Sequence, residues 1–358
     1  MKIGIMSMQR IRNYGSFLQA YGLKITIENL GHEVVFVDYT VEKPIVARKK
    51  EKFLFRVKRK LNKVVRYNIL GNKDINILYD EHYLPLLGVS REKVYNTPVD
   101  TLVIGSDEVF NCLQPNPLVG YSKELFGANA KAKHIISYAG SFGHTTLEGL
   151  KEYKIDKEVG ELFKKFKSIS IRDNNSFKII KNLIGKEPNL NVDPVIISNF
   201  DKYIVEQNNL KDYILVYAYG NRINTKEEIN AIKQFAKKHN KKLVSIGTHQ
   251  DWTDIKLNVN PFELLGYVKA ADYIITDTFH GSIFAIKYNR PFATIIRETN
   301  KQKLGDLLRR FSVADREVIK MDRMEEILLT PINFNKVNQI IEEETKKSIQ
   351  YLENNLNM

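Results

Sequence analysis

The sequence predicts an α/β protein built from two doubly wound, Rossmann-like domains that face each other across a cleft. Short apolar runs of strand length alternate with segments of helical periodicity along most of the chain. The 358 residues also exceed what one compact core usually holds, so two domains of ordinary size are expected. Open sheets of this kind bind ligands beyond the carboxyl ends of their strands, which predicts an active site between the two halves.

The first half opens with a strand, a helix and a second strand. Gly31 follows the first helical segment and is expected to end it. Pro194 is expected to stop the last strand of this half. The predicted strands are Lys2–Ser7, His32–Asp38, Thr101–Ile104, His134–Ser137, Ser168–Ile171 and Asn191–Asp193, and the predicted helices are Asn13–Leu30, Leu147–Phe166 and Asn175–Ile184.

The second half begins at Tyr213 and repeats the alternation. Thr225 precedes a helical segment and is followed three residues later by an acid, Glu228, which is typical of a helix N-terminus. The predicted strands are Ile214–Tyr219, Lys242–Ile246, Tyr273–Thr276 and Phe292–Ile296, and the predicted helices are Thr225–Asn240, Asn260–Lys269, Gly281–Lys287 and a terminal one at Asn335–Leu352.

These patterns suggest three units along the chain. We expect an N-terminal domain at 1–205, with a basic helical insertion at about 44–97, and a C-terminal, donor-binding domain at 206–330. The two would be joined near Asn199–Lys211, and residues 331–358 would form a C-terminal helix.

The net charge of +13 is concentrated in one segment. Between Arg48 and Arg66 there are ten Lys or Arg residues and one acid, and apolar residues recur there at helical spacing. A basic amphipathic helix is typical of contact with an anionic membrane surface or an acidic ligand, but it is equally compatible with a solvated helix packed on the domain. Nucleic acid is not expected as a partner, because no nucleic-acid-binding motif accompanies the charge.

Several other classes of protein are disfavoured. The sequence has no apolar run of about eighteen residues and its N-terminus reads as a strand, so we expect a cytoplasmic protein, either free or peripheral at the inner face of the membrane. Cys112 is the only cysteine, and no His, Asp or Glu cluster has ligand spacing, so no metal is expected. No Gly-rich loop ending in Lys-Ser or Lys-Thr is present, which argues against P-loop chemistry.

The segment from Ala271 to Ile296 is the first place to expect chemistry. A predicted strand is followed by a turn carrying Asp277, Thr278 and His280, and then by a helix. This arrangement places backbone amides and the positive end of a helix dipole at the carboxyl edge of a sheet. An imidazole there can transfer a proton near neutral pH. The alternative is that His280 only caps the turn.

Six short segments, in order along the chain, resemble those of the polysaccharide pyruvyl transferases. The resemblance covers roughly residues 1–310, apart from the basic insertion. The segments are NYGSFLQAY from Asn13, IGSDEVFN from Ile104, SYAGSFG from Ser137, SIRD from Ser170, VDP from Val192 and TDTFHGS from Thr276.

The resemblance implies a glycosyltransferase-B-like architecture and a reaction that needs no cofactor. The enolpyruvyl carbons of phosphoenolpyruvate would be transferred to two hydroxyls of a sugar, in a cell-surface polysaccharide or a lipid-linked glycan precursor, forming a pyruvate ketal and releasing phosphate. Where the family commonly has Gln and then Trp after Gly-Ser-Asp, this chain has Glu108 and Phe110. Where many relatives carry Asn-Ser-Arg, Gln302 and Lys303 follow Asn300 and Lys301. These departures leave open which sugar is the acceptor and which residue is one of the ligands of the donor phosphate.

Phosphoenolpyruvate carries a phosphate and a carboxylate, so its site needs fixed cations and N–H donors. Arg172, at the end of a predicted strand, is expected to be catalytic and to converge with His280, the general acid or base, although a surface ion pair is an alternative. Arg297 and Lys303 are expected to bind the donor, and for Lys303 a solvated helix face is the alternative. The amides of Gly281 and Ser282 would complete the anion site.

The remaining candidates lie on other turns that follow strands. Asp107 is expected to bind or deprotonate the acceptor hydroxyl, or else to cap the following turn. Asp193 is expected only to orient its turn. Further substrate-binding candidates are Asn13, Gln19, Ser106 and Ser141.

Two other functions fit the same sequence. One is a glycosyltransferase that uses a nucleotide-sugar donor on the same architecture, because fold does not fix function. The other is a non-catalytic protein that binds acidic glycan or anionic membrane through Arg48–Arg66.

Overall fold

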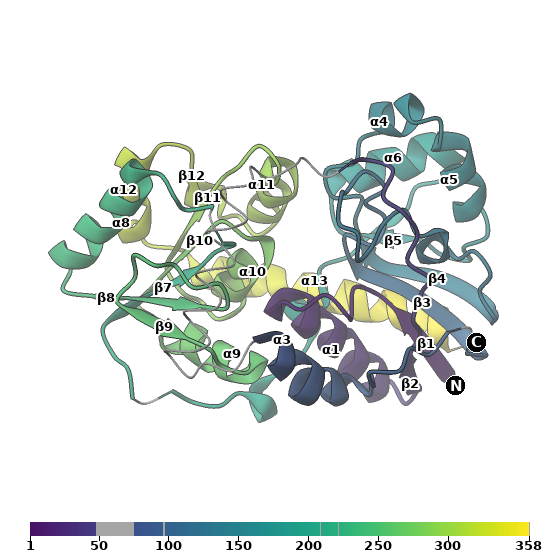
Figure 1. Ribbon diagram of the computed structural model, residues 1–358, viewed down its shortest axis with the longest axis horizontal. Helices are drawn as coiled ribbons and strands as arrows, with labels where there is room; N and C mark the ends of the chain where they lie inside the picture. The colour runs from purple at the N-terminus through teal and green to yellow at the C-terminus, as the bar shows by residue number, and fades with distance from the viewer. Residues whose placement is uncertain (48–74, 96, 208, 221, 358) are drawn as a thin grey trace.

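The structure, a computed structural model, describes residues 1–47, 75–95, 97–207, 209–220 and 222–357. Within these residues the chain forms two lobes, each built on a six-stranded sheet whose strands all pair in parallel (Figure 1). The predicted basic helix at Arg48–Arg66 lies outside the described residues. None of the helices in the described ranges is long and apolar enough to cross a membrane.

The first lobe contains a sheet with the strand order β2-β1-β3-β4-β5-β6. Its central strands are almost fully buried, as expected for a parallel sheet covered on both faces. The strands are β1 Lys2–Met6, β2 Glu33–Phe36, β3 Val99–Asp107, β4 Ala132–Gly140, β5 Ser170–Ile171 and β6 Asn189–Leu190. The helices are α1 Tyr14–Asn29, α3 Ile75–Leu78, α4 Leu147–Glu152, α5 Asp156–Phe163, α6 Asn174–Ile184 and α7 Pro194–Ile197, with single helical turns at Tyr79–Tyr83, Leu84–Leu87, Lys123–Phe126 and Asp201–Tyr203.

The second lobe contains a sheet with the order β12-β11-β10-β7-β8-β9. Its strands are β7 Tyr213–Tyr217, β8 Lys242–Ile246, β9 Ile255–Leu257, β10 Tyr273–Thr276, β11 Phe292–Ile295 and β12 Glu317–Val318. Its helices are α8 Lys226–Lys238, α9 Pro261–Ala270, α10 Phe279–Lys287, α11 Lys301–Arg310 and α12 Met324–Leu329, with single turns at Ala314–Arg316 and Met321–Arg323.

The last helix, α13 (Phe334–Leu356), leaves the second lobe and returns to the first (Figure 1). The Tyr351 hydroxyl donates to the carbonyl of Ser137 on β4, and the Asn191 amide donates to Ser348 Oγ. α1 lies between the lobes, where Phe17 makes an edge-to-face contact with Phe262 of α9. These contacts join the two lobes into one apolar cluster that contains residues of both sheets.

Several helices begin where a short polar side chain accepts a hydrogen bond from the first turn. Thr225 and Glu228 form the capping box that the sequence predicts for α8. The other side-chain N-caps that position the site are Asn13 before α1, Asp173 before α6, Asp193 before α7, Asn260 before α9 and Thr278 before α10.

Two predictions of local structure are wrong. The single helix expected over Leu147–Phe166 is two helices, because the chain turns at Tyr153 and Lys154, where Lys154 adopts a φ of 57°. Pro194 does not stop a strand but begins α7. A proline is well placed there because the first residue of a helix needs no N–H partner.

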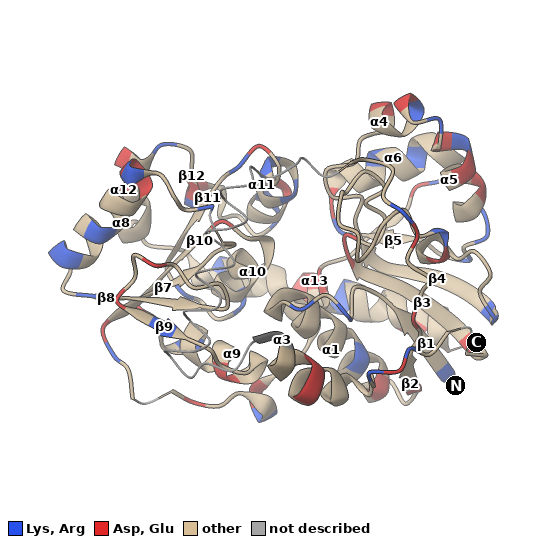
Figure 2. Cartoon of the chain, in the orientation of Figure 1, with Lys and Arg blue, Asp and Glu red and all other residues tan. Residues whose placement is uncertain are grey.

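Basic and acidic residues both occur along the outer helices, for example on α4 and α5 (Figure 2). Strand β3 is apolar from Leu102 to Ile104, and β10 is apolar at Ile274 and Ile275. The ionic groups near the cleft come from the carboxyl ends of the strands and from the segments that follow them.

Candidate active site

The candidate site lies where the strand order of each sheet reverses. In the first sheet, β1 and β3 are neighbours, but the chain continues from β1 to β2 on one side and from β3 to β4 on the other. In the second sheet, β7 and β10 are neighbours, and the chain continues from β7 to β8 on one side and from β10 to β11 on the other. In doubly wound folds this reversal opens a crevice at the carboxyl ends of the two strands. Asp107 ends β3, and His280 lies in the first turn of the helix that follows β10.

A buried ionic cluster occupies the first-lobe side. Arg172 Nη1 donates to Asp193 Oδ2 at 2.7 Å, and Nη2 donates to Asp107 Oδ1 at 3.1 Å. The Arg172 side chain is only 2% exposed. Asp107 has a φ of 84°, and its other carboxylate oxygen accepts from the Ser16 hydroxyl at 2.8 Å. The guanidinium therefore holds together two turns that are far apart in the sequence.

The charges in this cluster stabilise one another. Burial alone would raise the pKa of Asp107, but the Arg172 and His280 side chains and the Ser16 hydroxyl hold it below its ordinary value. Burial likewise opposes ionisation of Asp193, whose pKa is lowered by His280 and Arg172. One guanidinium and two carboxylates leave one net negative charge, so a proton on the His280 imidazole would bring the cluster to neutrality.

His280 reaches this cluster from the second lobe. Its Nε2 lies 3.5 Å from Asp193 Oδ2, beyond a strong hydrogen bond, and this buried nitrogen has no hydrogen-bond partner among the described residues. Arg172 and His280, which the sequence predicts to converge, thus approach the same carboxylate oxygen.

Two neighbours fix the imidazole in this position. Phe279, the preceding residue, packs edge-to-face against the imidazole with ring centroids 5.6 Å apart, and its ring centroid lies 4.3 Å from the Arg172 guanidinium carbon. On the other side is Gly15 of α1, where an added Cβ would lie 2.3 Å from His280 Nδ1. Only glycine permits this close approach.

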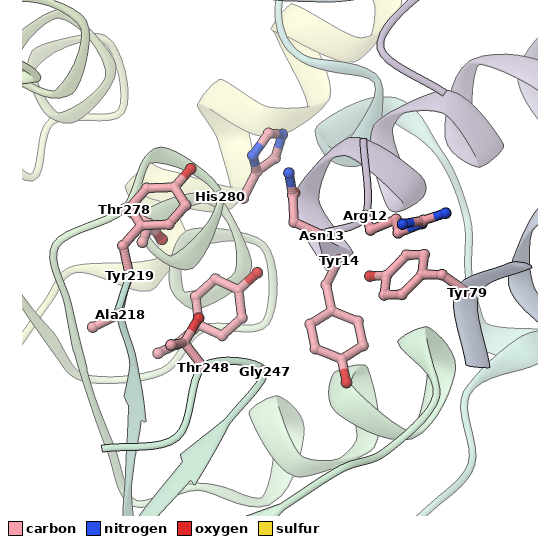
Figure 3. Close-up of a pocket in the computed structure, with 11 residues that line it drawn as sticks. Arg12, Asn13, Tyr14, Tyr79, Ala218, Tyr219, Gly247, Thr248, Thr278 and His280 are labelled. Carbon is pink, nitrogen blue, oxygen red and sulfur yellow. The ribbon is translucent and has the colours of Figure 1, made fainter. Parts of the chain in front are cut away.

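Next to His280 a cavity of about 130 Å³ opens between the lobes (Figure 3). Most of the residues that line it follow strands of the two sheets. They are Arg12, Asn13 and Tyr14 after β1; Tyr217, Ala218 and Tyr219 at the end of β7; Gly247 and Thr248 after β8; and Thr278 and His280 after β10. Tyr79, at the start of the helical turn Tyr79–Tyr83, completes the lining.

Comparison with protein-family models finds one that matches most of the chain. The model for polysaccharide pyruvyl transferase matches residues 13–299. The chain belongs to this family. A comparison with curated protein sequences finds none that matches.

Comparison with solved structures supports the fold. Spinosyn rhamnosyltransferase SpnG superposes with a TM-score of 0.50 at 11% identity, covering 99% of this chain and 100% of that one. The S. aureus protein MnaA, in a co-structure with UDP, gives a TM-score of 0.50 at 12% identity, covering 99% and 96%. At such low identity these similarities show the fold alone. With the two parallel sheets, they confirm the predicted glycosyltransferase-B-like, two-domain α/β architecture.

Three cations of this family member follow second-lobe strands, and each has a carboxylate neighbour. Arg297 Nη1 donates to Glu228 at 2.5 Å, and Lys303 Nζ donates to Glu108 at 2.5 Å, across the cleft. Arg222, which the sequence analysis did not select, stacks on Tyr219 and lies 3.8 Å from Asp277. Their side chains are 26%, 19% and 37% exposed, respectively, compared with 2% for Arg172.

The amides of Gly281 and Ser282 are already bonded within the helix. Gly281 N donates to the Thr278 hydroxyl, which caps α10, and Ser282 N donates to the Thr278 carbonyl. An anion at these amides would have to displace that cap.

Among the other predicted ligands, only Asn13 lines the cavity. Gln19, Ser106 and Ser141 are fully buried. Gln19 donates to Ser7, Ser106 donates to the carbonyl of Ala139, and Ser141 donates to Asp173 at 2.6 Å. These three side chains support the turns that carry the site.

Sequence reasoning undervalued Asp193 and missed Tyr79. Asp193 was expected only to orient its turn, yet its Oδ2 is the atom that Arg172 and His280 share. The VDP segment was the available signal. Tyr79 lies outside every family segment, and no pattern in the sequence points to it. Within the described residues no group of His, Cys, Asp and Glu could hold a metal ion.

Proposed function

We propose that this protein is a ketal-forming pyruvyltransferase that uses phosphoenolpyruvate as donor. The acceptor is a sugar of a cell-surface polysaccharide or of a lipid-linked glycan precursor. The observation that carries the proposal is the approach of His280 to the Arg172–Asp193–Asp107 cluster, beside an interlobe cavity, in a chain of this family.

The reaction consumes one phosphoenolpyruvate and two sugar hydroxyls. A proton adds to the methylene carbon, which becomes a methyl group, and positive character develops at the adjacent carbon. One hydroxyl attacks that carbon and loses its proton. The second hydroxyl then replaces the phosphate at the same carbon, and its proton leaves with the phosphate. The products are a pyruvate ketal and inorganic phosphate, and no oxidant or reductant is consumed.

His280 is the group best placed to move these protons, because its Nε2 is not committed to a hydrogen bond. Asp193 positions the ring and compensates its charge when it is protonated. Asp107 accepts a hydrogen bond from Ser16, and exchanging that hydroxyl for a sugar hydroxyl would let it bind the attacking oxygen.

The donor anion is expected on the second lobe. Arg172 donates from both terminal nitrogens to carboxylates and its side chain is almost fully buried, so we assign it to organising the cluster and not to contacting the donor. Arg222, Arg297 and Lys303 keep more exposed surface and can exchange their present carboxylate neighbours for phosphate or carboxylate oxygens of the donor.

Phosphate release from phosphoenolpyruvate, measured against a panel of sugar acceptors, tests this function. We expect phosphate to appear only when both substrates are present, together with an acid-labile pyruvate ketal detected by mass spectrometry. Binding of a nucleotide-sugar without phosphate release from phosphoenolpyruvate would instead support a glycosyltransferase and overturn the proposal.

A further inference from the structure

The cavity of Figure 3 is walled mainly by aromatic rings and neutral polar groups. Four tyrosines contribute to it, from both lobes, and Asn13, Thr248 and Thr278 add hydrogen-bonding side chains. Flat aromatic faces beside amide and hydroxyl groups suit a pyranose ring, which has an apolar face and a rim of hydroxyls. The tyrosines are Tyr14, Tyr79, Tyr217 and Tyr219.

Among the described residues of the lining, one carries a permanent positive charge, which is little for a donor that bears both a phosphate and a carboxylate. Arg12 is the permanently charged residue of the lining, and Asp80 binds it through two hydrogen bonds, Nε to Oδ1 at 3.0 Å and Nη2 to Oδ2 at 2.6 Å. The cations Arg222, Arg297 and Lys303 do not line the cavity. The space therefore favours a neutral ligand over a trianionic one.

The hydroxyl of Tyr79 lacks a hydrogen-bond partner among the described residues, and this points to a ligand. Tyr79 is 1% exposed, and its hydroxyl forms no hydrogen bond within the described part of the chain. In Figure 3 this hydroxyl points toward Asn13 and Tyr14, into the space between the lobes. Buried hydroxyls normally have a partner, and a sugar hydroxyl in the cavity would supply one.

We propose that this cavity is the acceptor subsite and that it takes one neutral hexopyranose ring. This inference rests on the proposed function. The ring would lie against the tyrosines, with hydroxyls directed to Tyr79 Oη, Thr248 Oγ1 and Asn13 Nδ2. The volume of about 130 Å³ corresponds to roughly ten water-sized positions, close to the size of a single hexose. Since His280 forms part of the wall, the bound hydroxyls lie beside the group that moves protons.

The test measures the binding of methyl glycosides of glucose, galactose, mannose and N-acetylglucosamine by saturation-transfer NMR. In parallel, calorimetry measures the affinity for phosphoenolpyruvate. Tyr79→Phe removes only the unpartnered hydroxyl and should weaken the best glycoside roughly three- to tenfold, without lowering the melting temperature. Thr248→Trp, at an exposed position, should fill the cavity and abolish glycoside binding. Both variants should bind phosphoenolpyruvate as the wild type does.

Tyr83→Phe is the matched control. Tyr83 is buried on the same helical turn, but its hydroxyl donates to the carbonyl of Val259 and it does not line the cavity. Its loss should lower the melting temperature and leave glycoside binding unchanged.

The possible failures can be told apart. If Thr248→Trp abolishes phosphoenolpyruvate binding while glycosides still bind, the cavity is the donor site and the inference is wrong. It is also wrong if the wild type binds phosphoenolpyruvate but no glycoside, or if both variants leave every glycoside signal intact. If glycoside binding depends on these residues but phosphoenolpyruvate does not bind the wild type, the proposed donor fails and the sugar subsite stands.

Discussion

Among the described residues, two contacts between ionisable side chains cross from one lobe to the other, and they differ in burial. Asp193 and His280 are 1% and 9% exposed, whereas Glu108 and Lys303 are 26% and 19% exposed. The buried contact is long, at 3.5 Å, and the exposed one is short, at 2.5 Å. The better hydrogen bond is therefore the one that water and ions can more easily replace.

This difference suggests separate tasks for the two contacts. Asp193 and His280 lie in a low-dielectric region where charges interact strongly, so that contact suits proton transfer in a fixed geometry. Mutual attraction holds the pKa of Glu108 below and that of Lys303 above their ordinary values, although burial opposes both shifts. In the proposed function, the donor anion would take the place of Glu108 beside Lys303.

The largest effect is expected from His280→Gln, which keeps a polar side chain but cannot act as an acid or base near neutral pH. Turnover should fall by about two to four orders of magnitude, and the free energy of unfolding should fall by no more than about 3 kcal/mol, so that the protein still folds. Phosphate release and urea unfolding measure the two quantities. His134→Gln, at the amino end of β4, is the matched control and should change neither the turnover nor the free energy of unfolding. Near-normal turnover of His280→Gln would remove this residue from the mechanism.

Asp193→Asn should have the next largest effect, because it removes a carboxylate from a buried cluster and leaves Arg172 with Asp107 alone. The expected loss is about 3–5 kcal/mol of unfolding free energy, measured by urea titration.

The pH dependence of that loss has a definite sign. The folded-state pKa of Asp193 is lowered, so its contribution is fully present above its unfolded pKa of about 4 and disappears as the pH falls toward the folded value. The gap between wild type and Asp193→Asn should therefore be constant above about pH 5 and shrink below about pH 4. A gap that grows on acidification would contradict the ionised state assigned to Asp193.

The sequence was sufficient to predict the elements that carry the site. Apolar runs ending in Gly, Asp or Thr mark the carboxyl ends of strands, so the turns bearing Asp107, Arg172 and His280 could be placed at one crevice. The bounds of the strands Lys242–Ile246 and Tyr273–Thr276 were predicted to the residue.

The pairing of charges could not be predicted in this way. Arg297 binds a carboxylate 69 residues away, and Lys303 binds one 195 residues away. Such pairs depend on how the lobes pack, which no local pattern encodes. The same reason explains Asp193: beside Pro194 it looks like a turn residue, and only packing of α10 against α7 brings His280 to it.

A smaller effect is expected from the more exposed contact. Glu108→Gln would remove the carboxylate that holds Lys303 and so release Lys303 for the proposed donor. The KM for phosphoenolpyruvate should fall roughly two- to fivefold, and the gain should diminish at high salt. Lys303→Gln should raise the same KM, with turnover little changed. Unchanged KM values in both variants would show that Lys303 does not contact the donor.

The smallest effect is expected from Asp306→Asn, at the outer rim of the cleft. Asp306 on α11 accepts hydrogen bonds from the backbone and side-chain amides of Asn174, at the first turn of α6 in the other lobe. Asp173 already caps that helix through Ser176 N, so the second carboxylate adds mainly a screened interaction with the helix dipole. The substitution should lower the unfolding free energy by less than about 1 kcal/mol and leave the KM values of both substrates unchanged. A large rise in either KM would mean that this outer contact, and not only the buried one, sets the distance between the lobes during turnover.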